Sequence, residues 1–206
     1  MIEYKTLKTA AQAEYEEKHS KFIGAVMPVT TEKQALDFIA SRRQDTYGAR
    51  HNVYAYILRE NNISRYSDDG EPHSTAGMPT LDVLRKQCLV DCCVVTTRYF
   101  GGILLGTGGL VRAYTLAASK AVEKSGIAIM RESCYCSVEC DYPEFKMVES
   151  LIVSAFGRVE NSEFTNKVIV KFWVTKENYD ELYFKFRDTF CGKIFPEILK
   201  IDFAEA

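Results

Sequence analysis

Five glycines fall within nine residues, directly after an apolar run, and this pattern constrains the fold more than any other feature of the chain. The apolar run at residues 90–98 is typical of a strand inside a sheet. A helix is expected from about Gly109 to Lys124, because its apolar residues recur at helical spacing and Gly126 can end it. The glycines between them are Gly101, Gly102, Gly106, Gly108 and Gly109. A glycine turn that leads into a helix can hold bare N–H groups and the positive end of the helix dipole against an anion.

This segment matches none of the standard phosphate loops. A Walker loop needs lysine where Thr107 stands, and a dinucleotide fingerprint needs glycine where Val111 stands. The serine hydroxyls of the sugar-kinase type of loop are missing as well. Two interpretations therefore stay open: the glycines bind an anionic group of a partner, or they serve a tight turn and close packing of the helix on the sheet.

A second dense segment, residues 66–79, contains three carboxylates, a histidine and several hydroxyls. Asp68, Asp69 and Glu71 could hold magnesium or calcium or contact a partner. The spacing does not fit an EF-hand or a zinc site. The structural alternative is a turn at Asp68 and Asp69, with Ser74 or Thr75 capping a short helix that continues to Gln87. His51 could approach Asp68 or Asp69 as an oriented general base, or as an ordinary hydrogen-bonded histidine.

Six strings carry a resemblance to the IMPACT/YigZ family. They lie at residues 18–23, 49–56, 67–72, 75–79, 98–102 and 105–111. The resemblance covers the entire chain. It implies an α+β protein with an N-terminal domain like domain 2 of ribosomal protein S5, followed by a ferredoxin-like domain. It also implies a cytoplasmic protein linked to translation, with RNA, the ribosome or a translation factor as partner.

The chain also divides in two when its patterns are considered without the family. Residues 1–127 form the first predicted domain, with strands near 14–29 and 51–59 and a helix near 31–43. Residues 128–206 form the second. Its expected elements are a strand at 134–140, a helix from Pro143 to about Ala155, strands at 158–160 and 167–174 around a turn at 161–163, a helix from Lys176 to about Phe190, and a strand at 193–203. This βαββαβ order is the ferredoxin-like split fold.

Charge limits the kind of nucleic-acid contact. The chain has a net charge of −2; residues 1–127 carry 16 basic and 14 acidic side chains, and the remainder carries 10 and 14. A protein that binds mainly by counterion release is strongly basic, so RNA contact needs a local patch on the first domain. The candidates are Lys21, Arg42, Arg43, Arg50, Arg98 and Arg112, and of these Arg98 and Arg112 flank the glycine segment. The alternative is ordinary surface charge, with Arg98 paired to an acidic loop residue.

Cysteine usage and hydropathy bear on the compartment. The seven cysteines are an odd number, and adjacent Cys92 and Cys93 in an apolar strand suit packing better than disulfide bonding. A reducing cytoplasm is the expected location. No apolar run reaches the roughly 20 residues that span a bilayer, so no membrane contact is expected. No metal or cofactor is predicted.

Two functions follow from these observations. The favoured one is a non-enzymatic, translation-associated regulator that binds RNA, the ribosome or a translation factor through the N-terminal domain. The alternative is an enzyme that acts on a nucleotide or another phosphorylated small molecule, with the glycine segment as phosphate cradle and magnesium at the acidic loop. The missing lysine and serines weigh against the enzyme.

Overall fold

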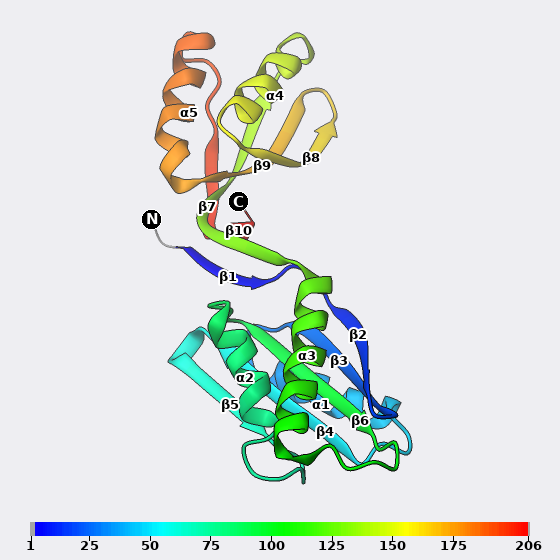
Figure 1. Ribbon diagram of the computed structural model, residues 1–206. Helices are drawn as coiled ribbons and strands as arrows, with labels where there is room; N and C mark the ends of the chain where they lie inside the picture. The colour runs from blue at the N-terminus through cyan, green and yellow to red at the C-terminus, as the bar shows by residue number, and fades with distance from the viewer. Residues whose placement is uncertain (1–2, 206) are drawn as a thin grey trace. The chain divides into compact units, whose positions relative to one another are not determined.

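The computed structural model describes residues 3–205 (Figure 1). The chain divides into two compact units: Tyr4–Ala128 forms the N-terminal unit, and Glu3 groups with residues 129–205 in the C-terminal unit. Both contain an antiparallel sheet with helices, so the predicted α+β class is confirmed. Within the described part of the chain, no helix is both long and apolar enough to cross a membrane.

The N-terminal sheet has the order β2-β3-β6-β4-β5. Its strands are β2 (Ala11–Glu17), β3 (Ser20–Pro28), β4 (His51–Leu58), β5 (Ile63–Ser67) and β6 (Cys92–Tyr99), and the short η1 (Glu60–Asn62) connects β4 to β5. All neighbouring strands run antiparallel. Lys18 and His19 turn the β2–β3 hairpin with positive φ angles, which explains the predicted interruption near His19.

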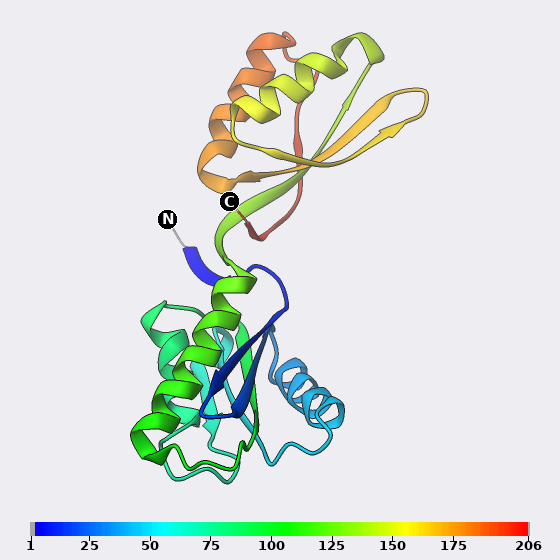
Figure 2. The ribbon, with the colours of Figure 1, turned by 45° about the vertical axis from the view of Figure 1, so that its right-hand side comes forward.

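Helices cover both faces of this sheet. Helix α1 (Glu32–Asp45) packs on one face, and α2 (Gly77–Lys86) and α3 (Gly106–Ser125) pack on the other (Figure 2). On the central strand β6, Cys93 and Val95 join the cluster beneath α1, whereas Cys92 and Val94 join the cluster beneath α2 and α3. Because successive side chains point to opposite faces, a strand covered on both sides is apolar throughout. This accounts for the continuous apolar run in the sequence.

The C-terminal unit contains the predicted βαββαβ order. Its elements are β7 (Ile127–Cys140), η2 (Tyr142–Glu144), α4 (Phe145–Ser154), β8 (Arg158–Phe164), β9 (Val168–Thr175), α5 (Lys176–Thr189) and β10 (Glu197–Glu205). Strand β7 pairs with β9 and β10, and β9 pairs with β8, which is the ferredoxin-like strand order. A short strand, β1 (Glu3–Leu7), opens the described part of the chain.

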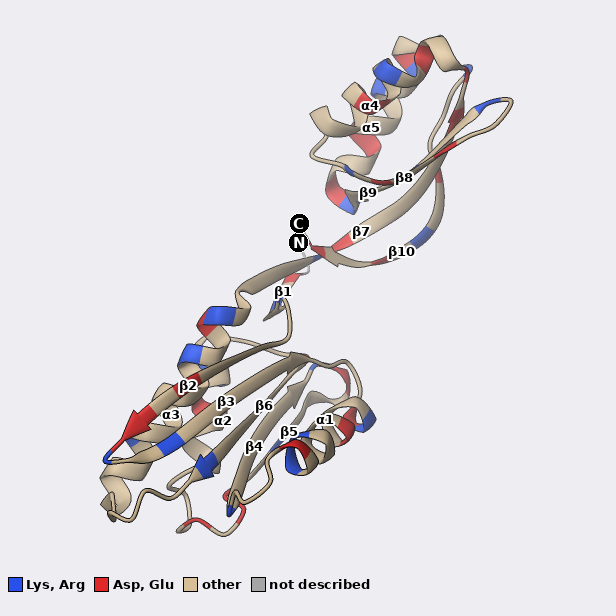
Figure 3. Ribbon diagram, turned by 90° about the vertical axis from the view of Figure 1, so that its right-hand side faces the viewer, with Lys and Arg blue, Asp and Glu red and all other residues tan. Residues whose placement is uncertain are grey.

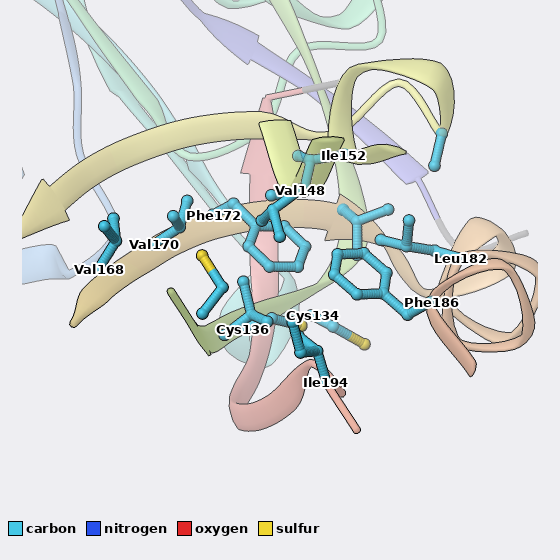
Figure 4. Close-up of a cluster of buried hydrophobic side chains, with 14 residues drawn as sticks. Cys134, Cys136, Val148, Ile152, Val168, Val170, Phe172, Leu182, Phe186 and Ile194 are labelled. Carbon is cyan, nitrogen blue, oxygen red and sulfur yellow. The ribbon is translucent and has the colours of Figure 1, made fainter. Parts of the chain in front are cut away.

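One core holds this unit together. The side chains of alternate residues on β7 and β9 contact those of α4 and α5, including Cys136, Phe172 and Phe186, and all three are fully buried (Figure 4). The buried residues of the period-two alternation predicted at residues 134–140 therefore form the core-facing side of β7.

Several predicted boundaries were wrong. Strand β7 begins at Ile127 rather than at residue 134, and α3 begins at Gly106 rather than Gly109. The turn predicted at 161–163 lies inside β8; the chain reverses at Thr165, whose N–H donates to the Lys167 carbonyl. Polar residues on β8 resemble a turn because this edge strand is mostly exposed. Neither β1 nor β5 was predicted from the sequence pattern.

Candidate functional site

The two conspicuous segments meet at one end of the N-terminal sheet. In the strand register, Lys21 of β3 pairs with Tyr99 of β6, and His51 of β4 pairs with Arg98 of β6. The glycine segment leaves the sheet after β6, and the acidic loop leaves it after β5. Figure 3 shows basic and acidic residues gathered at this end of the unit. We call it the loop end, comprising residues 19–21, 50–51, 66–77 and 98–112.

Asp68 holds the start of helix α2. Its Oδ1 accepts hydrogen bonds from the backbone N–H groups of Ala76 and Gly77 at 3.1 and 2.8 Å, and its Oδ2 accepts one from the N–H of Ser74 at 2.9 Å. The predicted cap by Ser74 or Thr75 was wrong, because the Thr75 hydroxyl donates to the Pro72 carbonyl and the Ser74 hydroxyl contacts the His73 ring. The carboxylate of Asp68, which precedes the helix by several residues, therefore accepts from the free N–H groups at the helix start in place of a neighbouring hydroxyl.

Asp69 fastens the loop to β4 and α1. Its Oδ2 accepts from the Asn52 N–H at 2.6 Å, and its Oδ1 accepts from Arg43 at 2.8 Å. The backbone carbonyl of Asp69 lies 2.8 Å from His51 Nδ1. Because a carbonyl can only accept, Nδ1 carries the proton of this bond. His51 thus approaches Asp69 as predicted, but its partner is the backbone rather than a carboxylate.

Glu71 is the centre of a buried polar group. Its Oε1 accepts from Arg98 Nη1 at 2.7 Å and from the Tyr114 hydroxyl at 2.8 Å. The side chains of Arg98 and Glu71 are only 7% and 4% exposed. Burial and the neighbouring Glu71 carboxylate raise the pKa of Tyr114. Arg98 also lies 5.5 Å from the ring centroids of Phe22 and Phe100, so it acts as a structural link between β6, the acidic loop and α3.

All three loop carboxylates therefore accept hydrogen bonds from the protein itself, and Asp68 and Asp69 use both of their oxygens. A cation would have to displace these bonds before it could bind. Among the described residues, no three or more His, Cys, Asp or Glu side chains gather in a metal-binding arrangement. The acidic loop is therefore a turn that its own hydrogen bonds hold in place.

The glycines of the second segment differ in their roles. A Cβ on Gly101 would lie 2.0 Å from the carbonyl carbon of His19, so close backbone packing requires this glycine. Gly102 and Gly106 have φ angles of +85° and +69°, which side chains disfavour. Gly108 and Gly109 lie in the first turn of α3, and a Cβ on Gly108 would meet no atom within 4 Å. Gly108 does not have the positive φ of Gly102 and Gly106.

The first turn of α3 is open to solvent. Gly106, Thr107, Gly108 and the preceding N-cap residue offer no side-chain cap. No acidic residue occupies this turn. Its N–H groups therefore remain available to an external acceptor. Arg112 is exposed in the second turn, and Arg50 is exposed just before β4.

Sequence reasoning missed the apolar part of this surface. Phe100, Ile103 and Leu104 are 45%, 44% and 82% exposed, and they form the tip of the glycine segment. The available signal was that glycines lie on both sides of Ile103 and Leu104, and that Phe100 directly precedes Gly101. Lys21 has an exposed partner, Glu14, at 2.8 Å.

Known proteins are similar to this chain over the part that contains the loop end. The Impact N-terminal domain matches residues 18–122. The chain is 36% identical over 188 residues to IMPACT family member YvyE of Bacillus subtilis, covering 90% of this chain and 82% of that protein. It is 30% identical to IMPACT family member YigZ of Escherichia coli, covering 86% and 88%. This chain belongs to the IMPACT family.

A solved structure extends the likeness to both units. The crystal structure of a hypothetical protein covers 97% of this chain and 98% of its own, with 27% identity and a TM-score of 0.62. The resemblance stated from the sequence is thus confirmed. The residues that form the loop end, from His19 to Arg112, all fall within the segment matched by the family domain.

Proposed function

We propose that this IMPACT-family protein is a non-enzymatic, translation-associated regulator that acts in the cytoplasm and binds RNA of the ribosome through its loop end. One observation carries the proposal: the uncapped, exposed first turn of α3 lies at the same end of the sheet as Lys21, Arg50 and Arg112. Backbone N–H groups and arginines are the donors that contact phosphate in RNA.

The exposed tip of the glycine segment adds a second kind of contact. Leu104 and its apolar neighbours lie beside the open helix turn, and solvent-exposed apolar groups of this size suit burial against a partner. Residues 1–127 carry 16 basic and 14 acidic side chains, a net charge of only +2, so binding would depend on this patch rather than on overall charge. A translation factor with an acidic surface is the alternative partner that the test must separate.

Arg98 pairs with an acidic loop residue, which was the alternative considered from the sequence. Its guanidinium is buried beside Glu71, whose carboxylate also accepts from Tyr114, so in this proposal Arg98 supports the surface from below. Arg50 and Arg112 are the exposed arginines that would contact phosphate.

The test is co-sedimentation with ribosomes from a lysate, with and without nuclease. We expect Arg112→Ala to weaken binding about tenfold, because a charge-assisted hydrogen bond is worth roughly 1.5 kcal/mol or more. Gly108→Val should also weaken it, since the position is open and only an approaching partner would meet the new side chain. Lys124→Ala is the matched control, because it removes one charge from the last turn of the same helix.

Salt and nuclease separate the outcomes. Binding to RNA should weaken as salt rises and be lost after nuclease treatment. Binding that survives nuclease would point to a translation factor. Binding that ignores both salt and the two loop-end variants would refute the proposed surface. Metal-dependent phosphate turnover by the purified protein, lost in Asp69→Asn, would replace the proposal with the enzyme alternative.

A further inference from the structure

The C-terminal sheet has one face that its helices do not cover. Helices α4 and α5 pack on the same side of this sheet, over the core-facing residues Cys136, Val170 and Phe172 (Figure 4). Their neighbours along β7 and β9, including Tyr135 and Trp173, alternate to the other side and are half-buried rather than buried. We call this side the open face.

Two aromatic side chains lie at the centre of the open face. Tyr135 of β7 and Trp173 of β9 are direct partners in the strand register. Their ring centroids are 4.8 Å apart at an interplanar angle of 36°. Lys200 of β10 places its Nζ 5.1 Å from the Trp173 ring and 5.9 Å from the Tyr135 ring. Strands β7 and β9 are the two inner strands of the β10-β7-β9-β8 part of the sheet, and aromatic rings on two such neighbouring strands are the kind of stacking platform that single-stranded RNA uses.

Glu160 of the edge strand β8 holds both rings by their polar edges. Its Oε1 accepts from Trp173 Nε1 at 3.4 Å. A hydrogen bond to the same carboxylate raises the pKa of Tyr135. These bonds fix the orientation of the rings before a ligand arrives, which lowers the entropy cost of stacking on them.

A pocket of about 650 Å³ adjoins Trp173 on the same unit. It is lined among others by Arg131, Phe156, Arg158 and Asn178. Phe156 is 88% exposed and has a φ of +55°, an unfavourable conformation for a bulky residue. Arg158 forms no ion pair within the described residues, whereas Arg131 pairs with Glu3. The volume falls within the range that holds one small planar ligand, such as a nucleobase with its sugar.

The charges on this face are balanced. Lys171 pairs with Glu163 at 2.7 Å, and Lys200 lies 3.5 Å from Asp202. A surface with balanced charges would not attract the phosphates of an RNA duplex. A duplex also presents few base faces on which the aromatic rings could stack. The open face suits unpaired bases, since every base has a flat face for stacking and stacking needs no net charge.

We propose that the open face binds single-stranded RNA by stacking bases on Tyr135 and Trp173, with a further base beside Phe156 and one phosphate on Arg158. The proposal goes beyond the loop-end function, because it concerns different residues in the other unit. Either site can fail without the other.

Trp173 is the only tryptophan of the chain, so its fluorescence reports directly on this face. The probe is an unstructured RNA of about ten nucleotides, titrated into the full-length protein. We expect quenching of the Trp173 emission that saturates. We also expect only a weak dependence of the affinity on salt, since about one phosphate is neutralised.

Variants then test the stacking. Tyr135→Leu should weaken binding about tenfold or more, within the range known for loss of one base-stacking ring. Phe156→Asn should weaken it too and is safe for the fold, because asparagine tolerates positive φ. Phe184→Leu is the matched control: this ring is 52% exposed on α5, on the helical side of the sheet. Far-UV circular dichroism confirms that each variant is folded.

Three results would overturn the proposal. They are an unchanged Trp173 emission at saturating RNA, an equal loss of affinity in Phe184→Leu, and equal affinity for duplex RNA of the same sequence. Arg112→Ala at the loop end should leave the quenching unchanged. If Arg112→Ala abolishes ribosome binding while quenching persists, the two sites are separate.

Discussion

The buried link between Arg98, Glu71 and Tyr114 makes the sharpest prediction about stability. Arg98→Ala removes the cation from Glu71, whose side chain is only 4% exposed. Breaking one partner out of a buried ion pair costs about 3–5 kcal/mol, because the remaining charge is buried without compensation. That is a large part of the roughly 5–15 kcal/mol by which domains are typically stable.

The exposed pair Lys21–Glu14 provides the internal standard. Both side chains are about half exposed, at 47% and 55%. Exposed pairs contribute roughly 0–1 kcal/mol, so Glu14→Ala should change the free energy of unfolding by less than about 1 kcal/mol. The two variants remove ion pairs of similar length, at 2.7 and 2.8 Å, and differ mainly in burial.

Urea denaturation followed by two probes measures the effect. Far-UV circular dichroism reports on both units, whereas Trp173 fluorescence reports on the C-terminal unit alone. We expect Arg98→Ala to lower the circular dichroism midpoint of the N-terminal unit and to leave the fluorescence midpoint in place. The triple variant Arg98→Met, Glu71→Met, Tyr114→Phe should regain much of the lost stability, since an apolar group can replace a buried polar one.

One result would refute this reasoning. If Arg98→Ala keeps the stability within about 1 kcal/mol of the parent protein but abolishes RNA binding, Arg98 is a ligand-contacting residue and not a structural link.

Two further predictions rest on packing and burial. Gly101→Ala should destabilise the protein by about 2–3 kcal/mol, because its Cβ would lie 2.0 Å from the His19 backbone. Gly108→Ala should be neutral or stabilise the protein by up to about 1 kcal/mol, because a Cβ there meets no atom within 4 Å. Thermal unfolding compares the two variants, and equal changes in stability would contradict the close packing at Gly101. The exposed Cys88 and Cys191 should react with a thiol reagent at about pH 8 before the other five cysteines. Burial raises the pKa of Cys92 and Cys136 to about 12, so these two buried thiols stay protonated and unreactive at that pH. Mass spectrometry of the labelled protein measures the order of labelling, and rapid labelling of Cys92 would contradict the prediction.

Patterns that repeat along the chain can be read from the amino-acid sequence alone. The apolar run at β6, the period-two alternation of β7 and the alternating order of strands and helices in the second unit led to the correct fold class, because each depends on local periodicity. The family resemblance was carried by short strings in the N-terminal unit. Local signals failed where an element is short or exposed, as at β1, β5 and the polar strand β8.

The partners of the polar side chains depended on the fold. Glu71 meets Arg98 and Tyr114 across 27 and 43 residues of sequence, and Asp68 caps a helix eight and nine residues downstream. No spacing rule encodes these distances, because strand order and register decide which segments become neighbours. The same holds for Tyr135 and Trp173, which face each other only because β7 pairs with β9 in that register. The sequence therefore identified the glycine and acidic segments, and the packing within each unit decided which partners their side chains have.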